Sequence, residues 1–250
     1  MTIAHAVRGG IALACVLAWL GFVALPSLLL LSVPARWMPA ATRLSWVSGW
    51  AQAHCRLVLA AFGLGGARYE RRGTVRTDAA GIIVMNHQSL LDIPTAIVMC
   101  APLVPAFIAR ARYARVPLIA TGLRVADCPV VDPGRDRDAA LAQLAQAVHQ
   151  ERALLIYPEG HRSSDGSVQP FRTAGILAML RARRVPVWLI ATDGFCAGRR
   201  LIDLVMLHKV RGVTEVVGCF QPPVDDAALE GFVAMLQDEL ARAIARMRRR

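Results

Sequence analysis

Paired cysteines are missing from this sequence. It has six cysteines, but they are scattered and no two of them form a Cys-x-x-Cys pair. This pattern fits neither a disulfide framework nor a cysteine zinc site, and His161 has no second histidine at metal-ligand spacing. We therefore expect free thiols in a reducing, cytoplasm-facing environment, with no metal ion or other cofactor.

Several motifs of common enzymes are also missing. The sequence has no Gly-x-Ser-x-Gly elbow, no Gly-x4-Gly-Lys phosphate loop and no Gly-x-Gly-x-x-Gly fingerprint. Tyrosine is scarce, with three residues, and no nucleic-acid-binding module is recognisable. These absences argue against the chemistries that depend on those motifs and against a nucleic-acid partner.

Acidic residues are outnumbered by basic ones. The 250 residues include 29 Lys and Arg against 18 Asp and Glu, which gives a net charge of +11 and an isoelectric point near 10.6. The hydrophobic fraction is 55% and the mean hydropathy is +0.43, which is high for a freely soluble protein. Charge and apolar content together favour an anionic membrane surface as a partner.

The N-terminal part lacks charge over a long stretch. Residues 11–33 hold no charged side chain, and a helix of that length could cross a hydrocarbon core of about 30 Å. Pro26 would kink such a helix, so a hairpin or re-entrant helix is an alternative, and a cleaved signal peptide is another. A second helix is expected at 44–64, where two tryptophans suit either a membrane interface or an ordinary core helix. We assign residues 1–64 to an uncleaved, membrane-anchoring helical segment.

Residues 65–250 have the pattern of an α/β domain. Short apolar runs alternate with amphipathic stretches, which predicts a mixed sheet flanked by helices. The expected strands are 67–72, 81–85, 104–109, 125–131, 153–157, 185–191, 204–210 and 214–220. The expected helices are 95–100, 137–152, 175–183 and 226–250. The last helix ends in several arginines, which suit a helix C-terminus and could also touch acidic lipid.

The first group of candidate functional residues follows strand 81–85. His87 and Asp92 come directly after it, five positions apart. On an ideal helix that spacing separates two residues by about 140°, so they can meet only if His87 precedes the helix. Pro94 favours a helix start nearby, which places His87 in the turn and Asp92 at the helix start. Asp92 would then orient one imidazole nitrogen and leave the other as a general base; a helix N-cap is the alternative for Asp92.

The second group follows strand 153–157. It reads Tyr157-Pro158-Glu159-Gly160-His161-Arg162-Ser163, with Arg172 nine residues further on. A strand end, a glycine that permits close backbone approach, and two arginines are what an anionic headgroup requires. Alone, this segment would be interpreted as a solvated loop with a pair of arginines.

Together, the two groups resemble the glycerolipid acyltransferase family, and in particular bacterial 1-acyl-sn-glycerol-3-phosphate (lysophosphatidic acid) acyltransferases. The resemblance covers about residues 81–190 and rests on Asn86-His87-x4-Asp92 and on the Pro158–Ser163 motif, in the family's order. It implies that His87 deprotonates the acceptor hydroxyl, which attacks an acyl thioester, and that Asp92 orients His87. It also implies a substrate-binding set, namely Asn86, Glu159, Gly160, Arg162, Ser163 and Arg172.

The reaction implied by this resemblance transfers a fatty acyl group from acyl-CoA or acyl-carrier protein to 1-acyl-sn-glycerol-3-phosphate, giving phosphatidic acid for phospholipid biosynthesis. The enzyme would lie in the inner (cytoplasmic) membrane, on an anionic surface, with the acyltransferase domain (65–250) facing the cytoplasm. Two alternatives stay open. One is acylation of another lyso-lipid, such as lyso-ornithine lipid, and the other is a catalytically silent lipid-binding relative.

Three positions depart from the family pattern. The family has four sequence blocks, of which Asn86–Asp92 resembles the first and Tyr157–Ser163 the third. The second block, here a looser match from Arg110 to Asp132, usually ends in Asp-Arg, but Pro133 follows Asp132 in this chain. Either Arg135 or Arg137 substitutes for the missing arginine, or the acceptor lacks a phosphate at that place. His161 stands where threonine is usual, either capping the loop or reaching a phosphate, and Arg172 stands where lysine is usual. These changes leave the expected fold and reaction type intact and weaken the assignment of the acceptor.

Overall fold

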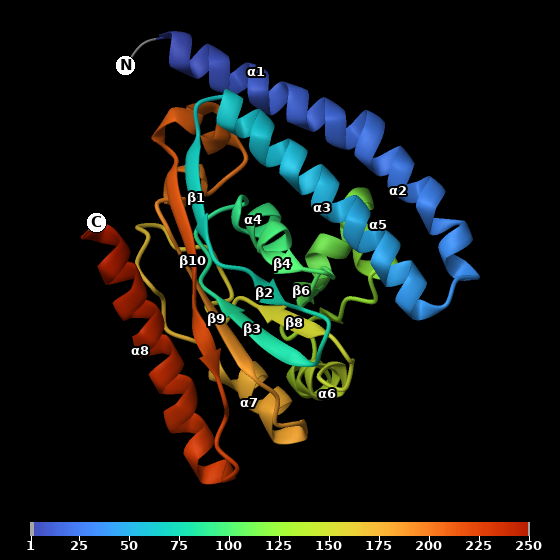
Figure 1. Ribbon diagram of the computed structural model, residues 1–250, viewed down its shortest axis with the longest axis vertical. Coiled ribbons are helices and arrows are strands. Elements are labelled where there is room, and N and C mark those ends of the chain that lie inside the picture. Colours follow the sequence, from blue (N-terminus) through green and yellow to red (C-terminus); the bar gives the residue numbers. More distant parts are fainter. Residues whose placement is uncertain (1–2, 250) are drawn as a thin grey trace.

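The computed structural model describes residues 3–249, which form a central sheet with helices on both faces (Figure 1). The strands are β1 (Arg68–Arg72), β2 (Val75–Arg76), β3 (Gly81–Met85), β4 (Cys100–Ala101), β5 (Ala106–Phe107), β6 (Ala109–Arg110), β7 (Val130–Val131), β8 (Ala153–Ile156), β9 (Val187–Asp193) and β10 (Arg211–Phe220). The α-helices are α1 (Ile3–Trp19), α2 (Leu25–Ser32), α3 (Ala40–Leu64), α4 (Asp92–Met99), α5 (Pro117–Val125), α6 (Arg137–Ala147), α7 (Thr173–Ala182) and α8 (Leu229–Arg248).

The main sheet has the strand order β1-β10-β9-β3-β8-β5. Neighbouring strands of this sheet, within the described residues, run parallel except β9 and β10, which are antiparallel. The sheet is therefore mixed and flanked by helices, which confirms the predicted fold class. Because β8, β3 and β9 are adjacent and parallel, their C-terminal ends lie side by side at one edge.

Strand β3 is buried on both faces of the sheet. Ile82 and Val84 belong to an apolar cluster with α6, α7 and α8, whereas Ile83 and Met85 belong to a second cluster with α4. All four side chains are fully buried. A strand buried on both faces has a continuous apolar sequence, which is why the pattern at 81–85 predicted this strand with the correct bounds.

The N-terminal segment does not reverse at Pro26, where a hairpin or re-entrant helix was one of the alternatives. A π-helical stretch, Leu20–Ala24, lies directly before Pro26 and joins α1 to α2 without reversing the chain. The shifted hydrogen-bond pattern of a π-helix accommodates a residue without an N–H group. The chain reverses at the 3-10 turn Pro34–Arg36, and α3 then runs back beside α1 (Figure 1). A hairpin at Pro26 is therefore wrong, and the hairpin lies after α2.

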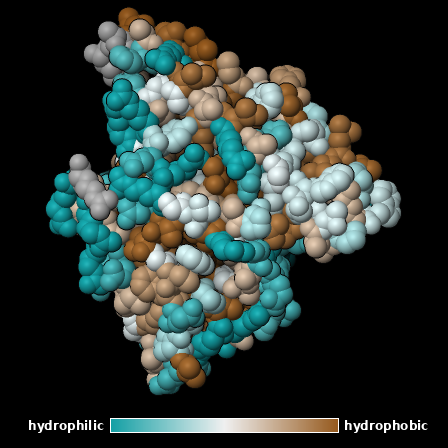
Figure 2. Space-filling view, in the orientation of Figure 1, coloured by the Kyte–Doolittle hydropathy of each residue, from teal (hydrophilic) through white to brown (hydrophobic). Residues whose placement is uncertain are grey.

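Ile3–Arg36 is long and apolar enough to cross a membrane, and 22% of its most apolar window is buried. Figure 2 shows apolar side chains along the upper and right-hand margins, where α1 and α2 lie in Figure 1. Large exposed apolar residues on these helices include Ile11, Phe22 and Leu30. One helix of this kind gives weak support for membrane association, and the division of the chain at residue 64 stays a prediction.

The strand expected at 204–210 is wrong. Ile202–Lys209 instead forms 3-10 helical turns that pack on α1. Leu204 and Leu207 are three positions apart, which is the repeat of a 3-10 helix, and both enter the apolar cluster formed with α1. A short apolar run does not distinguish a strand from a buried helical turn, so the distant partner α1 decides the structure.

The strand expected at 125–131 is also mostly wrong. Val125 ends the helix α5, which begins at Pro117, and β7 contains the strand residues Val130 and Val131. Pro117 is the first residue of α5, and a proline at this position has a backbone angle suited to a helix start. The prediction from the sequence did not use this signal. The expected strand 104–109 is divided between β5 and β6.

Two helices end earlier than expected. Helix α6 ends at Ala147 rather than at residue 152. The last helix was predicted at 226–250, but its first residues form a 3-10 turn (Asp226–Ala228) and α8 ends at Arg248. Arg250 lies outside the described residues. Helix ends are the least certain part of a periodicity argument, because the apolar repeat continues past the last hydrogen bond.

A glycine at the end of β9 provides a stability test. Gly194 has φ +81°, and a Cβ there would lie 1.9 Å from the carbonyl oxygen of Arg211. We expect Gly194→Ala to lower the free energy of unfolding by about 2 kcal/mol or more. Gly231→Ala, in α8 with open space around the new methyl group, should raise it by about 0.5–1 kcal/mol. Denaturant unfolding in detergent measures both, and shifts of equal sign would contradict this account.

Candidate active site

The candidate site lies where β3, β8 and β9 end. The His87 loop (residues 86–91) connects β3 to α4, and Tyr157 directly follows β8. Asp193 is the last residue of β9. The C-terminal ends of neighbouring parallel strands therefore bring together segments that are far apart in the sequence, as is usual for sites in α/β proteins.

His87 and Asp92 meet as the spacing predicted. Nδ1 of His87 lies 2.8 Å from Oδ2 of Asp92, and the Asp92 side chain is completely buried. The same oxygen accepts hydrogen bonds from the backbone N–H groups of Gln88 (2.6 Å) and Ser89 (2.8 Å). Both donors precede α4, so the carboxylate serves the His87 loop and does not cap the helix in the usual way.

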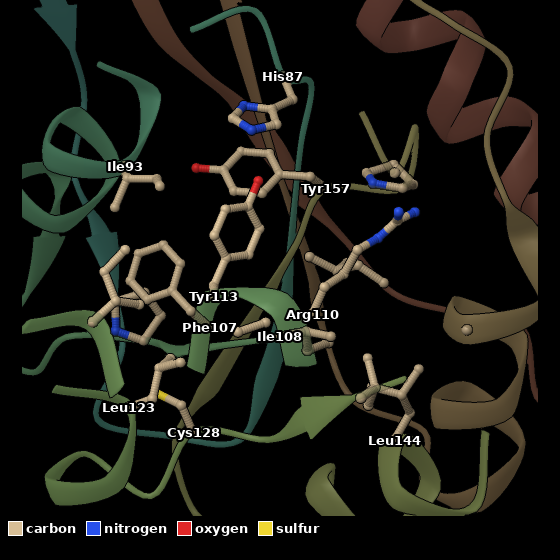
Figure 3. A pocket seen from close by; sticks show the side chains of 18 of the residues that line it. His87, Ile93, Phe107, Ile108, Arg110, Tyr113, Leu123, Cys128, Leu144 and Tyr157 are labelled. Atoms are coloured by element: carbon tan, nitrogen blue, oxygen red, sulfur yellow. The ribbon is translucent and has the colours of Figure 1, made fainter. Parts of the chain in front are cut away.

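The arrangement fixes how the imidazole is oriented. Because a buried carboxylate accepts hydrogen bonds, we infer that the neutral His87 ring places its hydrogen on Nδ1, which leaves the lone pair on Nε2. The His87 side chain is 13% exposed and lines a cavity, so that lone pair is accessible. The ring stacks on Tyr157, with centroids 4.2 Å apart and planes at 22° (Figure 3). Tyr157 is the first residue of the second sequence motif, but sequence reasoning gave it no role of its own.

Glu159 contacts the backbone of the His87 loop. Its two carboxylate oxygens accept hydrogen bonds from the N–H groups of His87 (2.9 Å) and Gln169 (3.1 Å), and the residue is 1% exposed. Burial raises the pKa of Glu159 to about 7, although these two hydrogen bonds oppose the shift. Both carboxylate oxygens therefore already have protein partners. Contact between Glu159 and a substrate stays a prediction.

Asn86 and Ser163 are buried beside the same loop. The Asn86 side chain donates to the carbonyl of Thr192 and accepts from its N–H, both at 2.8 Å, which joins β3 to β9. The N–H of Ser163 donates to the carbonyl of His87 at 2.7 Å. Each of the two residues is 1% exposed. Their hydrogen bonds hold the His87 loop in place. Binding of a substrate by Asn86 or Ser163 stays a prediction.

Two arginines converge on Gly160. This glycine has φ +72°, and a Cβ there would lie 3.0 Å from both the Arg110 and the Arg172 guanidinium groups. Burial, followed by the charge of Arg172, lowers the pKa of Arg110. Among residues 3–249, neither arginine forms an ion pair with a carboxylate. Two adjacent cations without a counter-ion are suited to bind an anion.

The remaining predicted residues have separate positions. Arg162 lines the cavity, and its guanidinium donates to the carbonyl of Arg199 at 2.5 Å. His161 is exposed at the cavity wall. Of the two possible substitutes for the family's missing arginine, Arg137 lines the cavity whereas Arg135 is not part of its lining. Residues 3–249 contain no cluster of His, Cys, Asp or Glu that could hold a metal ion.

The cavity has a volume of about 1150 Å³ and two kinds of lining. Arginines line one part of it, and aliphatic and aromatic side chains line the rest. Figure 3 shows His87 above Tyr157, with apolar side chains farther inside. The apolar lining includes Trp50, Ile93, Phe107, Leu123, Leu144 and Ile156. Such a cavity can hold a molecule with an anionic end and a hydrocarbon chain.

The buried Glu159 carboxyl predicts a pH-dependent stability. Because its pKa is raised from 4.5 to about 7, the folded state binds more protons than the unfolded state between these values. The wild type should therefore lose stability as the pH rises from about 4.5 to about 7, by an amount on the order of 2–3 kcal/mol. Glu159→Gln should lack this loss. Unfolding free energies of both proteins at pH 4.5 to 8 measure it, and a constant difference between them would contradict it.

Similarity to known proteins identifies the family and the fold of the chain. A family model described as Acyltransferase matches residues 67–191, which is half of the chain. The structure is similar to the crystal structure of the 1-acyl-sn-glycerophosphate (LPA) acyltransferase PlsC from Thermotoga maritima, with TM-score 0.60 and 19% identity, covering 90% of this chain and 98% of that one. No curated protein matches the sequence. The similarity to PlsC concerns the fold, while the family match extends over β3, β8 and the His87 loop, and the chain belongs to the acyltransferase family.

Proposed function

We propose that the enzyme transfers a fatty acyl group from a thioester to the free hydroxyl of 1-acyl-sn-glycerol-3-phosphate, giving phosphatidic acid. One observation carries the proposal. His87, which is held by the buried Asp92, lines the same cavity as the unpaired Arg110 and Arg172 and a large apolar surface. A proton acceptor, an anion site and a hydrocarbon site are the three parts that this reaction needs.

The proposed chemistry uses His87 as general base. Nε2 takes the proton of the acceptor hydroxyl while the oxygen attacks the thioester carbonyl, and Asp92 stabilises the imidazolium through Nδ1. The tetrahedral intermediate then collapses, the C–S bond breaks, and the imidazolium returns its proton to the leaving thiolate. The products are an ester and a free thiol, and His87 is regenerated.

The arginine pair supports an acceptor that carries phosphate. Arg110 and Arg172 present two guanidinium groups beside Gly160, and a phosphate can accept hydrogen bonds from both. Binding the phosphate would also relieve the repulsion between them. This placement compensates for the family arginine that Pro133 replaces, so the departure at that position does not require a phosphate-free acceptor.

The apolar surfaces support a membrane setting. The cavity lining suits the acyl chains of donor and acceptor, and the exposed helices α1 and α2 suit insertion into lipid. The excess of 11 positive charges suits an anionic leaflet and anionic substrates. We therefore propose anchoring in the inner membrane, with the active site on the cytoplasmic side where acyl-CoA or acyl-carrier protein is available.

Replacing the general base tests the mechanism. His87→Ala should lower thiol release from acyl-CoA, with lysophosphatidic acid as acceptor, by about 10²- to 10⁴-fold. Far-UV circular dichroism and membrane association should be unchanged, because His87 is a partly exposed cavity residue. His149→Ala, at an exposed histidine away from the site, should retain wild-type turnover. Wild-type activity in the His87 variant would overturn the mechanism.

An acceptor panel tests the role of the arginine pair. Arg110→Ala and Arg172→Ala should each raise KM for lysophosphatidic acid by about 10- to 100-fold, since a hydrogen bond to a charged group is lost. Acylation of a phosphate-free acceptor such as lyso-ornithine lipid should change little. Arg124→Ala, an exposed arginine on α5, is the matched control. A wild-type preference for the phosphate-free acceptor would instead support the alternative substrate, and no thiol release with any acceptor would support a silent relative.

A further inference from the structure

The last turn of α8 contacts the active-site edge of the sheet. Arg248 forms a bidentate ion pair with Asp193 at the end of β9, with Nε to Oδ2 at 2.9 Å and the second contact, to Oδ1, at 2.8 Å. The same guanidinium donates to the carbonyl of Gly166 at 2.8 Å. One arginine at the end of the described chain therefore joins β9 to the loop that follows the Pro158–Ser163 motif.

The side chain of Gln88 contacts the same two residues, Gly166 and Asp193, from inside the protein. Its amide nitrogen donates to the carbonyl of Gly166 at 3.0 Å and to Oδ1 of Asp193 at 3.1 Å, and its oxygen accepts from the N–H of Phe195 at 3.1 Å. The side chain is completely buried. Gln88 and Arg248 thus share two partners, Gly166 and Asp193, so a displacement of either partner is transmitted to Gln88.

Gln88 is directly connected to the proposed catalytic pair. It follows His87 in the chain, and its N–H donates at 2.6 Å to Oδ2 of Asp92, the same oxygen that contacts His87. Space around this network is limited: a Cβ on Gly166, which has φ +82°, would lie 3.0 Å from the Arg248 guanidinium. A small shift of the network therefore changes the position of the donor that holds Asp92.

Arg248 has a more specific environment than its neighbours in the basic end of α8. An exposed arginine on this helix could serve only to attract acidic lipid, and an isolated surface ion pair is worth little. The Arg248 side chain is itself 48% exposed, but it makes a bidentate contact with Asp193, whose side chain is 15% exposed, within a larger hydrogen-bond network. Arg246 is exposed and has no carboxylate partner among the described residues.

We propose that Arg248 is a positioning residue for acyl transfer, acting through Asp193 and Gln88 on the alignment of Asp92 and His87. Neither Arg248 nor Asp193 belongs to the segment 67–191 that matches the family model. The inference rests on the proposed function only for its kinetic readout. The C-terminal helix is then part of the catalytic architecture as well as a cover for the sheet.

The kinetic test compares two arginines of the same helix. Arg248→Ala should lower kcat by about 5- to 30-fold while KM for donor and acceptor stays within about twofold, because alignment is lost and substrate contacts are kept. Arg246→Ala removes the same charge and should leave kcat unchanged. Guanidinium ion at low millimolar concentration should partly restore kcat of the Arg248→Ala protein, because it can occupy the vacated position. A rise in KM without a loss of kcat, or equal losses in both variants, would overturn the proposal.

A second measurement does not depend on turnover. The backbone N–H groups of Gln88 and Ser89 should exchange with solvent deuterium faster in Arg248→Ala than in the wild type and in Arg246→Ala. Arg248→Lys keeps the charge but cannot form the bidentate contact, so its exchange rates at these amides should fall between those of Arg248→Ala and the wild type. This variant also serves as the test if the alanine variant folds poorly. Unchanged exchange at these amides would overturn the proposal. Absence of acyl transfer by the wild type, in contrast, would contradict the proposed function and leave the exchange comparison decisive.

Discussion

One carboxylate oxygen holds the active site together. Oδ2 of Asp92 accepts hydrogen bonds from two backbone N–H groups of the His87 loop and from the His87 ring. These three donors and the positive end of α4 offset part of the cost of burying the carboxylate, whose other oxygen, Oδ1, has no hydrogen-bond partner among the described residues. Since the loop and the imidazole share this oxygen, the backbone conformation before α4 determines the direction of Nε2, the nitrogen proposed to act as general base.

Much of the motif chemistry serves this loop. Glu159, Asn86 and Ser163 were expected to contact a substrate, yet their polar groups are engaged with the His87 loop and the neighbouring strand end. Buried polar groups need partners, and here those partners are backbone atoms that a loop would otherwise leave unpaired. We propose that recognition of the substrate falls to Arg110 and Arg172 and to the apolar wall of the cavity.

A feature could be predicted from the sequence when the residues that determine it are close together in the chain. Strand β3 and the meeting of His87 with Asp92 depend on neighbouring residues, so the continuous apolar run, the spacing of the two residues and Pro94 were sufficient. The 3-10 turns at Ile202–Lys209 depend on packing against α1, and the convergence of Arg110 and Arg172 depends on how β6 and the loop before α7 lie beside Gly160. Helix α5 was missed although its proline was a local signal. No periodic pattern connects Arg248 to Gln88, because their link passes through Asp193 and Gly166.

The protonation of the His87 ring tests the central claim most directly. Nuclear magnetic resonance of protein labelled with ¹⁵N-histidine, with the His87 signal assigned from a His87→Gln sample, shows which nitrogen carries the hydrogen in the neutral ring. The structure predicts a hydrogen on Nδ1 and a free lone pair on Nε2, with this preference weakened in Asp92→Asn. A hydrogen on Nε2 in the wild type would contradict the account, since the nitrogen facing the cavity could not then accept a proton.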